Sequence, residues 1–368
     1  MLQYYYTISG NVTGNVFEQF QHIFQGIEVG TVTIKDIAER CGVSVSTVSR
    51  VLNHHPDVSQ AVRDRVLQVI DEVHYVPNNS ARDLVKAQAD DIGLVIRGAG
   101  NPFYTEVVPV MEQAIRQAGY TMVIHQILSE DDEVRAGAEL VRSKRLKGLI
   151  LLGGRFDYSE EQLKVLDVPF VCCTYGNSFG KLKETQYSSV TIDDVYEAKK
   201  AVSYLVNQGH KKIAILLGST CDSSISELRY RGYCQALEDA GLELDEELVQ
   251  ETGSFSMEAA YLGMTKLLQR RDDFTAVFVI ADSMAMAAMR ALYDAGKTIP
   301  EDVSVIAIDG IPMSSYTVPA LTTLVQPKEN MGQEPVRILL DMIEGKAEHR
   351  HVTLPTEVRE GESVRTLN

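Results

Sequence analysis

The chain has 368 residues, 45% of them hydrophobic, five cysteines and a formal net charge of −16 at pH 7. This composition is that of an ordinary globular protein with about two or three domains. No apolar run approaches the roughly 20 residues that cross a bilayer. The first 34 residues lack lysine and arginine, so the basic start of a secretion signal is missing. With an odd number of cysteines and no metal-type Cys-x-x-Cys pair, we expect a cytoplasmic protein without metal or cofactor.

Residues 1–30 contain three consecutive tyrosines, at positions 4 to 6, but show neither a helical nor a strand period. We interpret this segment as an N-terminal extension rather than a functional arm. It is either disordered or the product of an early translation start.

Residues 31–76 predict three short helices. Thr33, with an aspartate three residues later, has the spacing of a capping box at a helix start. Gly42 allows a sharp turn, Ser44 caps a second helix, and Ser59 begins a third. Two short helices joined by a glycine turn and followed by a third indicate a helix-turn-helix headpiece that binds DNA.

The second helix buries Val48, Val51 and Leu52 and turns small hydroxyl groups outward. Small side chains let a helix lie deep in a major groove, where hydroxyls reach phosphates or base edges and Arg50 can contact guanine. The alternative is a solvated helix face, but the preceding glycine turn favours recognition. Residues 31–89 hold seven Lys/Arg and seven Asp/Glu, so the charge of −16 lies outside this segment. The outward residues are Val45, Ser46, Thr47, Ser49, Arg50 and Asn53.

Residues 77–91 form a hinge and linker. Pro77 ends the preceding helix, and the stretch "NNSARDLV" is too short to be a stable helix in water. It can fold when pressed onto DNA and a partner copy, with Leu84 as a wedge for a minor-groove step. A plain linker is the alternative.

From Ile92 the chain alternates strand-like and helical segments, which predicts two doubly wound parallel sheets. Ligands of such folds bind at the carboxyl ends of the strands. The predicted strands are 92–96, 120–126, 147–153, 169–174, 212–218, 276–281 and 303–309. The predicted helices are 104–118, 133–145, 226–241, 256–271 and 283–296.

The loops that follow these strands are polar and aromatic. Asp193, Arg229, Asp282 and Asp309 each fall near a strand end or a helix start. Carboxylates and arginines that converge with aromatic rings hold hydroxyl-rich ligands, because the charged groups bind the hydroxyls and the rings cover the apolar face. Each residue alone is more simply interpreted as a surface charge, but Arg229 and Asp309 stand out through their positions in the repeated pattern.

The motifs together resemble the lactose/galactose repressor (LacI/GalR) family. The similarity is carried by "VTIKDIAERCGVSVSTVSRVLN", "NPFY", "NQGHKKIAILLG", "RYRGYCQALEDAGL", "IPEDVSVIAIDG" and "PALTTLVQP". It runs from about Val32 to the C-terminal region. It implies a dimeric repressor of carbohydrate-utilisation genes that binds a pseudo-palindromic operator and is switched by a small molecule, most simply a sugar.

The resemblance also implies a fold, domain limits and sites. The fold is an all-α headpiece plus an α/β core of two subdomains, 92–193 with 327–356, and 194–326 with 357–368, like periplasmic binding proteins. The implied DNA-contacting residues are Thr33, Ser44, Val45, Ser46, Thr47, Ser49, Arg50, Asn53 and Leu84. The implied effector-binding residues are Phe103, Tyr104, Asp193, Arg229, Phe255, Asp282 and Asp309.

The chain departs from the family pattern in the effector region. Ala281 replaces a usual asparagine, and Gly310 stands where a second aspartate is common. A nucleoside or purine, or a partner protein, therefore remains an alternative to a sugar as the signal. A dinucleotide-binding enzyme is a remote alternative, because "GAGNPF" has Phe103 in place of the third glycine. No leucine heptads of a tetramerising tail follow the last strand, so we expect a dimer.

Overall fold

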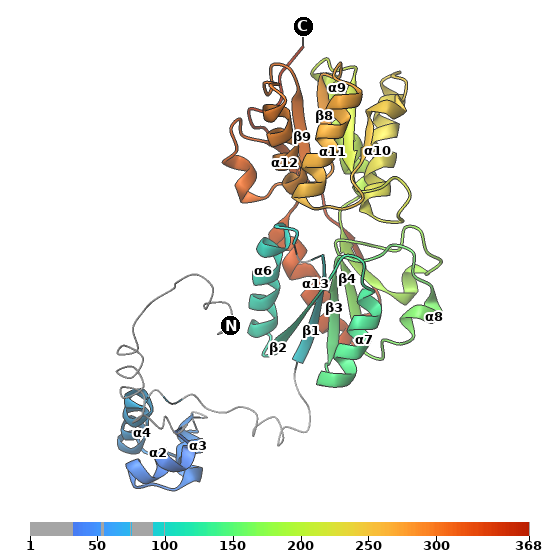
Figure 1. Ribbon diagram of the computed structural model, residues 1–368. Helices are drawn as coiled ribbons and strands as arrows, with labels where there is room; N and C mark the ends of the chain where they lie inside the picture. The colour runs from blue at the N-terminus through green and yellow to red at the C-terminus, as the bar shows by residue number, and fades with distance from the viewer. Residues whose placement is uncertain (1–31, 53–54, 74, 76–90, 99, 368) are drawn as a thin grey trace, which may run out of the picture. The chain divides into compact units, whose positions relative to one another are not determined.

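A computed structural model of the chain describes residues 32–52, 55–73, 75, 91–98 and 100–367. The chain divides into two compact units, Met1–Ala87 and Gln88–Asn368. Both are drawn in Figure 1. The extension 1–30, Asn53 and the hinge leucine Leu84 lie outside the described residues, so their predicted roles stay predictions.

The first unit contains three helices, α2 (Ile34–Cys41), α3 (Val45–Leu52) and α4 (Gln60–Glu72). Their contact is an apolar cluster in which Ile37, Val48, Val51 and Val66 are fully buried. Gly42 adopts φ 63°, and the following Val43 N–H donates to the Ala38 carbonyl at 3.0 Å. This left-handed turn ends α2 and lets α3 start in a new direction. The three predicted headpiece helices are present.

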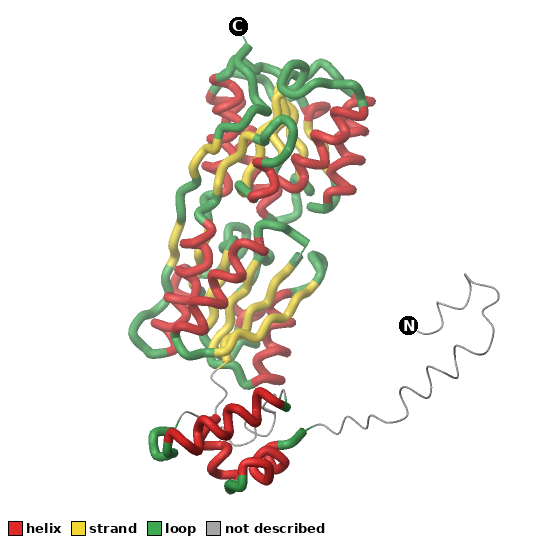
Figure 2. Tube along the Cα trace, turned by 90° about the vertical axis from the view of Figure 1, so that its left-hand side faces the viewer, coloured by secondary structure: helices red, strands yellow, loops and turns green. Residues whose placement is uncertain are grey.

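The second unit, residues 88–368, begins with a parallel sheet. Its strand order is β11-β5-β4-β3-β1-β2. Helices α6 (Tyr104–Gln117) and α13 (Lys328–Ile343) pack together on one face, while α7 (Glu133–Lys144) covers the other (Figures 1 and 2). The strands are β1 (Asp91–Arg97), β2 (Thr121–Ile127), β3 (Gly148–Leu152), β4 (Phe170–Cys173), β5 (Ser188–Thr191) and β11 (His351–Thr353).

A second sheet has the order β12-β10-β9-β8-β6-β7, and only its edge strand β12 runs antiparallel. Helices α9 (Asp194–Asn207) and α10 (Ile225–Asp239) pack together, as do α11 (Met257–Arg270) and α12 (Asp282–Asp294). The strands are β6 (Ile213–Leu217), β7 (Val249–Glu251), β8 (Ala276–Val279), β9 (Ser304–Asp309), β10 (Thr322–Val325) and β12 (Glu357–Arg359). Short helical turns are α8 (Glu160–Leu163), η1 (Glu184–Gln186), η2 (Glu246–Leu248) and η3 (Pro312–Ser315).

The chain passes between the two sheets at three places. It leaves the first sheet after β5, returns after β10, and leaves again between β11 and β12. Three crossings between the same two subdomains form a hinge about which the subdomains can move. The first strand begins at Asp91, which the sequence analysis had placed in the linker.

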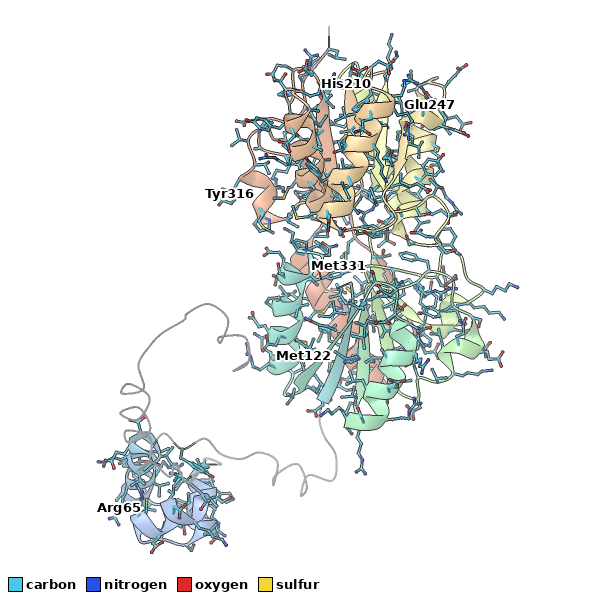
Figure 3. The ribbon with its side chains drawn as sticks, in the orientation of Figure 1. Arg65, Met122, His210, Glu247, Tyr316 and Met331 are labelled. Atoms are coloured by element: carbon cyan, nitrogen blue, oxygen red, sulfur yellow. The ribbon has the colours of Figure 1, made fainter. Side chains whose placement is uncertain are left out.

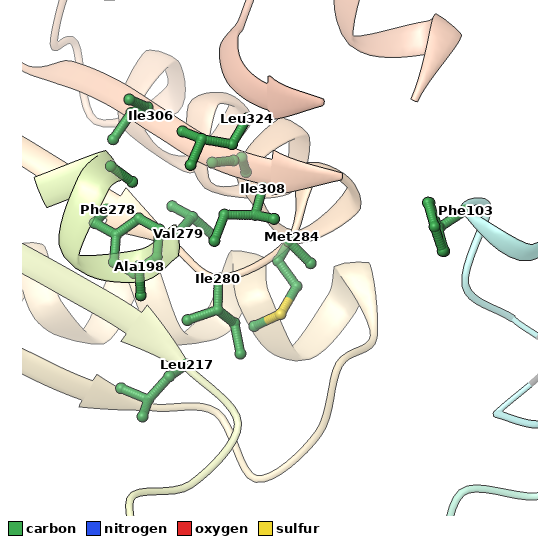
Figure 4. Close-up of a cluster of buried hydrophobic side chains, with 14 of the residues drawn as sticks. Phe103, Ala198, Leu217, Phe278, Val279, Ile280, Met284, Ile306, Ile308 and Leu324 are labelled. Carbon is green, nitrogen blue, oxygen red and sulfur yellow. The ribbon is translucent and has the colours of Figure 1, made fainter. Parts of the chain in front are cut away.

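The inner strands of both sheets are buried, whereas β2, β7, β11 and β12 are partly exposed. All residues of β3, β4, β6, β8 and β9 are buried, as expected of parallel strands covered by helices on both faces. Figure 4 shows Phe278, Ile306 and Leu324 packed inside the second subdomain. In the same view Phe103, on the ribbon of the first subdomain, lies apart from Ile280, Ile308 and Met284.

Close contact between α9 and α10 depends on Gly232, because a Cβ atom there would lie 2.2 Å from the Val195 carbonyl oxygen. We expect Gly232→Ala to destabilise the core by about 1–3 kcal/mol, the usual cost of overpacking, although alanine favours helices. Urea unfolding measures this change. Gly100→Ala is the control, since a Cβ there meets nothing within 4 Å. An unchanged unfolding midpoint for Gly232→Ala would contradict this account of the packing.

Candidate DNA interface and effector cavity

Helix α3 turns one face inward and one outward. Val48 and Val51 are fully buried, whereas Val45 is 40% exposed and Ser46 and Arg50 are exposed. Thr47 and Ser49 are half-buried at the edges of this face. The predicted recognition residues that the structure describes are thus on or beside the outward face of α3.

The start of α3 carries a cluster of hydroxyl groups. The Ser44 hydroxyl lies 2.8 Å from those of both Ser46 and Thr47, and it accepts the Thr47 N–H at 3.2 Å. Thr33, at the start of α2, donates its N–H and its hydroxyl to Asp36 at 2.7 and 2.8 Å. These bonds fix two helix N-termini, which are suitable binding points for DNA phosphates.

Arg50 lies on the outward face in an exposed ion pair. Its Nη1 atom is 3.1 Å from Asp57 Oδ2, and the two side chains are 59% and 45% exposed. Asp57 also lies 2.7 Å from the His55 ring. Exposed pairs contribute about 0–1 kcal/mol, so Asp57 orients the guanidinium without preventing it from binding a base.

The second unit contains a cavity of about 1420 Å3 at the carboxyl ends of both sheets. The loops after β1, β3, β6 and β8 contribute to its wall, which is where ligands of doubly wound folds bind. Its aromatic lining residues are Phe103, Tyr104, Phe156, Tyr175 and Phe255.

A buried ion pair lies in the wall contributed by the second subdomain. Arg229 of α10 donates from Nε and Nη2 to Asp194 Oδ1, at 2.9 and 2.8 Å, and from Nη1 to the Ile280 carbonyl. Both side chains are at most 3% exposed. Burial raises the pKa of Asp194, while the Arg229 charge opposes the shift. The pair joins α9, α10 and the end of β8.

Asp309 ends β9 with a carboxylate that is only half satisfied. Its Oδ1 accepts from Gln326 Nε2 at 2.8 Å, whereas its Oδ2 has no hydrogen-bond partner among the described residues. The residue is 3% exposed and adopts φ 139°, a conformation that non-glycine residues rarely take. Burial raises its pKa to about 7, which the nearby Arg229 charge opposes and the Asp282 charge reinforces. A ligand hydroxyl group would satisfy the free oxygen.

The cavity brings together Phe103, Tyr104, Arg229, Phe255 and Asp309 of the predicted effector-binding residues. Phe103 and Tyr104 meet edge to face, with ring centroids 6.1 Å apart. These residues come from both subdomains, so the cavity can close around a ligand that contacts both.

Asp193 and Asp282, also predicted to bind the effector, are not among the lining residues. Asp193 is exposed and caps α9 by accepting the Tyr196 N–H at 3.0 Å. Asp282 is fully buried and accepts from Ile311 N–H at 2.9 Å, Ser314 at 2.8 Å and Thr323. The structure therefore gives Asp193 a capping role and Asp282 a role inside the second subdomain.

Several cavity residues were missed by the sequence analysis. Asp194, next to the predicted Asp193, carries the ion pair with Arg229, and Gln326 binds Asp309. Which of the two adjacent aspartates faces the cavity depends on the orientation of α9, and the sequence does not show that orientation. Arg97 and Arg155 line the first-subdomain end. Arg97 directly follows a predicted strand and Arg155 comes two residues after one, and these positions were an available signal.

Among the described residues, no group of His, Cys, Asp and Glu could hold a metal ion. No described helix has the length and apolar character needed to cross a membrane.

Comparison with known proteins gives the family. A model of bacterial regulatory proteins of the lacI family matches residues 33–78, and a model of the periplasmic binding protein-like domain matches 202–364. The HTH-type transcriptional regulator MalR of Clostridium butyricum is 40% identical over 334 residues, which are 90% of this chain and 98% of MalR. The chain belongs to the lacI family. It is a DNA-binding transcriptional regulator, as the sequence analysis predicted.

Solved structures of the family have the same fold. The transcriptional regulator CelR in complex with cellobiose is 32% identical, with a TM-score of 0.68, over 90% of this chain and 99% of CelR. The Lac repressor dimer bound to operator and the anti-inducer ONPF is 26% identical, with a TM-score of 0.71, over 91% and 99% of the two chains. The predicted fold class, a helical headpiece and two α/β subdomains, is confirmed.

Asp309 should make the ligand-free protein less stable at higher pH. Its pKa is raised from 3.8 to about 7, so between these values the folded chain keeps a proton that the unfolded chain has lost, and stability falls as pH rises. The asparagine side chain of Asp309→Asn does not titrate, so the variant does not lose stability in this way. We expect the variant to gain about 1–3 kcal/mol over the parent between about pH 5 and about pH 8, as measured by urea unfolding. Parallel stability curves for the two proteins would contradict this.

Proposed function

We propose that this regulator is a cytoplasmic repressor that binds a pseudo-palindromic operator as a dimer and responds to a neutral sugar in the cavity. It acts by binding and not by catalysis. The observation that carries the sugar assignment is the cavity lining, which combines aromatic rings with charged hydrogen-bonding groups. Rings cover the apolar faces of sugars, while carboxylates and guanidinium groups bind their hydroxyls.

The sign of the charge favours a neutral ligand over a phosphorylated one. Three arginines in the lining stand against five carboxylates, so an anion would meet net repulsion. Hydroxyl groups can donate to the carboxylates and accept from the arginines without adding charge. The charged lining residues are Arg97, Arg155, Arg229, Glu130, Asp131, Asp194, Asp222 and Asp309.

The relatives support the same assignment. CelR was solved as a complex with cellobiose, a neutral sugar. Ala281 lines the cavity in place of the usual asparagine, and a Cβ at Gly310 would lie 2.7 Å from Val325 Cα. Of the two departures from the family pattern, Ala281 therefore changes the second-subdomain wall, and both leave Arg229 and Asp309 in place.

A dimer is supported by exposed apolar side chains of the second subdomain. Met313, Tyr316 and Val318 are 47%, 85% and 97% exposed, and Tyr316 projects outward in Figure 3. Exposed apolar side chains that lie this close together in sequence can contribute to an interaction surface. In the dimer, two headpieces read half-sites about one helical turn apart. Leu84 would enter the minor-groove step between them.

The mechanism is a two-state switch. Closing the subdomains around the sugar changes the position of β1, where the linker enters the core, and so changes whether the hinge residues 77–91 can fold on DNA. To change operator occupancy from about 99% to about 1%, the sugar must favour one state by roughly 5.5 kcal/mol.

Arg50→Ala tests the DNA interface. Loss of a bidentate contact to guanine costs about 1–3 kcal/mol, so operator affinity should fall toward that for unrelated DNA. Binding to labelled operator and to scrambled DNA measures this loss. Effector affinity should not change. Arg65→Ala, on the exposed face of α4, is the matched control. Equal loss of operator and effector binding in Arg50→Ala would contradict the separation of the two sites.

A thermal-shift panel tests the effector class. A ligand at about a hundred times its Kd stabilises the folded state by about 2.7 kcal/mol, which raises Tm by several degrees. We expect neutral sugars to raise Tm, and sugar phosphates, nucleosides and purines not to. A shift with a purine alone would overturn the sugar assignment and keep the repressor. No shift with any compound would point to a partner protein as the signal.

A further inference from the structure

The first-subdomain end of the cavity carries a second polar group, distinct from Arg229 and Asp309. Arg97 ends β1 and Arg155 follows β3, and both line the cavity. Tyr104 also lines the cavity and is close enough to both polar groups to be influenced by their charges. Burial raises its pKa to about 12, and it senses both the Asp309 charge, which raises the pKa, and the Arg97 charge, which lowers it.

Arg97 is fixed along one edge of its guanidinium group only. Its Nε donates to the Asp131 carbonyl at 2.9 Å and lies 3.6 Å from Glu133 Oε2. No hydrogen bond joins its Nη atoms to another of the described residues, and its side chain is 21% exposed. The outer edge of this fork can therefore donate to a ligand.

Glu133 forms an ion pair with Arg97. It is fully buried and its Oε1 accepts the Arg155 N–H at 2.8 Å, while its Oε2 has no hydrogen-bond partner among the described residues. Gly154 makes this arrangement possible, because a Cβ there would lie 2.4 Å from Glu133 Oε1 and 2.3 Å from Tyr175 Cζ. A buried carboxylate without full hydrogen bonding is costly, so this pair indicates a binding role for Arg97 rather than a stabilising one.

The surroundings of Arg97 disfavour a phosphate. Residues 130–133 are four consecutive carboxylates, and Glu130 and Asp131 line the cavity. Arg155 is already paired with Asp157, through Nε at 3.1 Å and Nη2 at 2.8 Å. An anion would accept hydrogen bonds from the free Nη atoms of Arg97 only, and the neighbouring carboxylates would repel it. A neutral hydroxyl group accepts the same hydrogen bonds without that repulsion.

We propose that Arg97 forms a second sugar subsite, and that the effector is a neutral oligosaccharide of at least two rings. One ring binds Arg229 and Asp309, and the other binds Arg97. This inference rests on the proposed sugar-regulated function. The cavity volume of about 1420 Å3 exceeds the ~300–1000 Å3 usual for small-ligand sites, so it has room for more than one ring.

Isothermal titration calorimetry of the full chain tests the subsite. The probes are glucose and galactose, the disaccharides maltose, cellobiose and lactose, and glucose 6-phosphate. We expect one disaccharide to bind at least about tenfold tighter than its component monosaccharides, because a hydrogen bond to a charged group supplies that factor. Arg97→Met should bring this ratio down to within about threefold of one.

Two further variants separate binding from folding. Arg97→Lys keeps a cation beside Glu133 but loses the planar fork, so it should fold normally and still lower the ratio. Arg116→Met, at an exposed i,i+4 pair with Glu112 outside the cavity, should leave the ratio unchanged. A disaccharide that binds no tighter than its component monosaccharides would overturn the subsite alone. A disaccharide-to-monosaccharide affinity ratio that is unchanged in both Arg97 variants would do the same. Tighter binding of glucose 6-phosphate than of glucose would overturn the neutral ligand. No binding of any sugar would overturn the proposed effector class itself, and the subsite with it.

Discussion

The effector region of this regulator depends on the buried ion pair between Arg229 and Asp194. Removing either partner from such a pair leaves an uncompensated buried charge, at a typical cost of about 3–5 kcal/mol. The pair connects α9 and α10 and, through the Ile280 carbonyl, the end of β8. Arg229 directs these bonds to Asp194 and the Ile280 carbonyl, and no hydrogen bond joins it to Asp309, whose Oδ2 has no partner among the described residues. The second subdomain thus holds a rigid charged wall with one oxygen unsatisfied.

The cavity as a whole is electrostatically incomplete. Its carboxylates outnumber its arginines, and Asp309 in its wall keeps one buried oxygen without a hydrogen-bond partner among the described residues, as does Glu133 outside the lining. Such groups cost free energy until a donor reaches them. A sugar hydroxyl supplies that donor at Asp309, and its binding free energy is largest when both subdomains close on it. The three chain crossings allow this closure, so the cost of the empty cavity becomes the driving force of the proposed switch.

The sequence was sufficient for the family, the fold class and most of the long elements. Strands β1, β3, β6, β8 and β9 are continuously apolar because helices cover both faces of the sheets. Such continuous apolar runs can be recognised directly in the sequence. The short strands β5, β7, β10, β11 and β12 were not predicted, because each mixes polar with apolar residues over only three or four positions, whereas the equally short β4 and β8 are wholly apolar. Helices α9 and α13 were not predicted either.

The candidate site was predicted less completely than the fold. Arg229 and Asp309 were singled out by their positions in the repeated pattern and by the family resemblance, and both line the cavity. Asp194 was missed in favour of Asp193, since only the orientation of α9 tells which aspartate faces inward and which caps the helix. Arg97 and Glu133 meet across 36 positions of sequence, and a contact of that kind depends on the packing of α7 against β1.

The central claim is that occupation of the cavity and binding of operator are coupled. The most direct test measures, on the full chain, how the sugar changes operator affinity and how the operator changes sugar affinity. Operator affinity is titrated with and without the disaccharide that binds tightest, and the affinity of that disaccharide is titrated with and without operator. The account predicts that each ligand changes the affinity of the other by the same factor, and that this factor approaches the roughly 10⁴-fold needed to change operator occupancy from about 99% to about 1%. Two affinities that do not respond to the other ligand would contradict it.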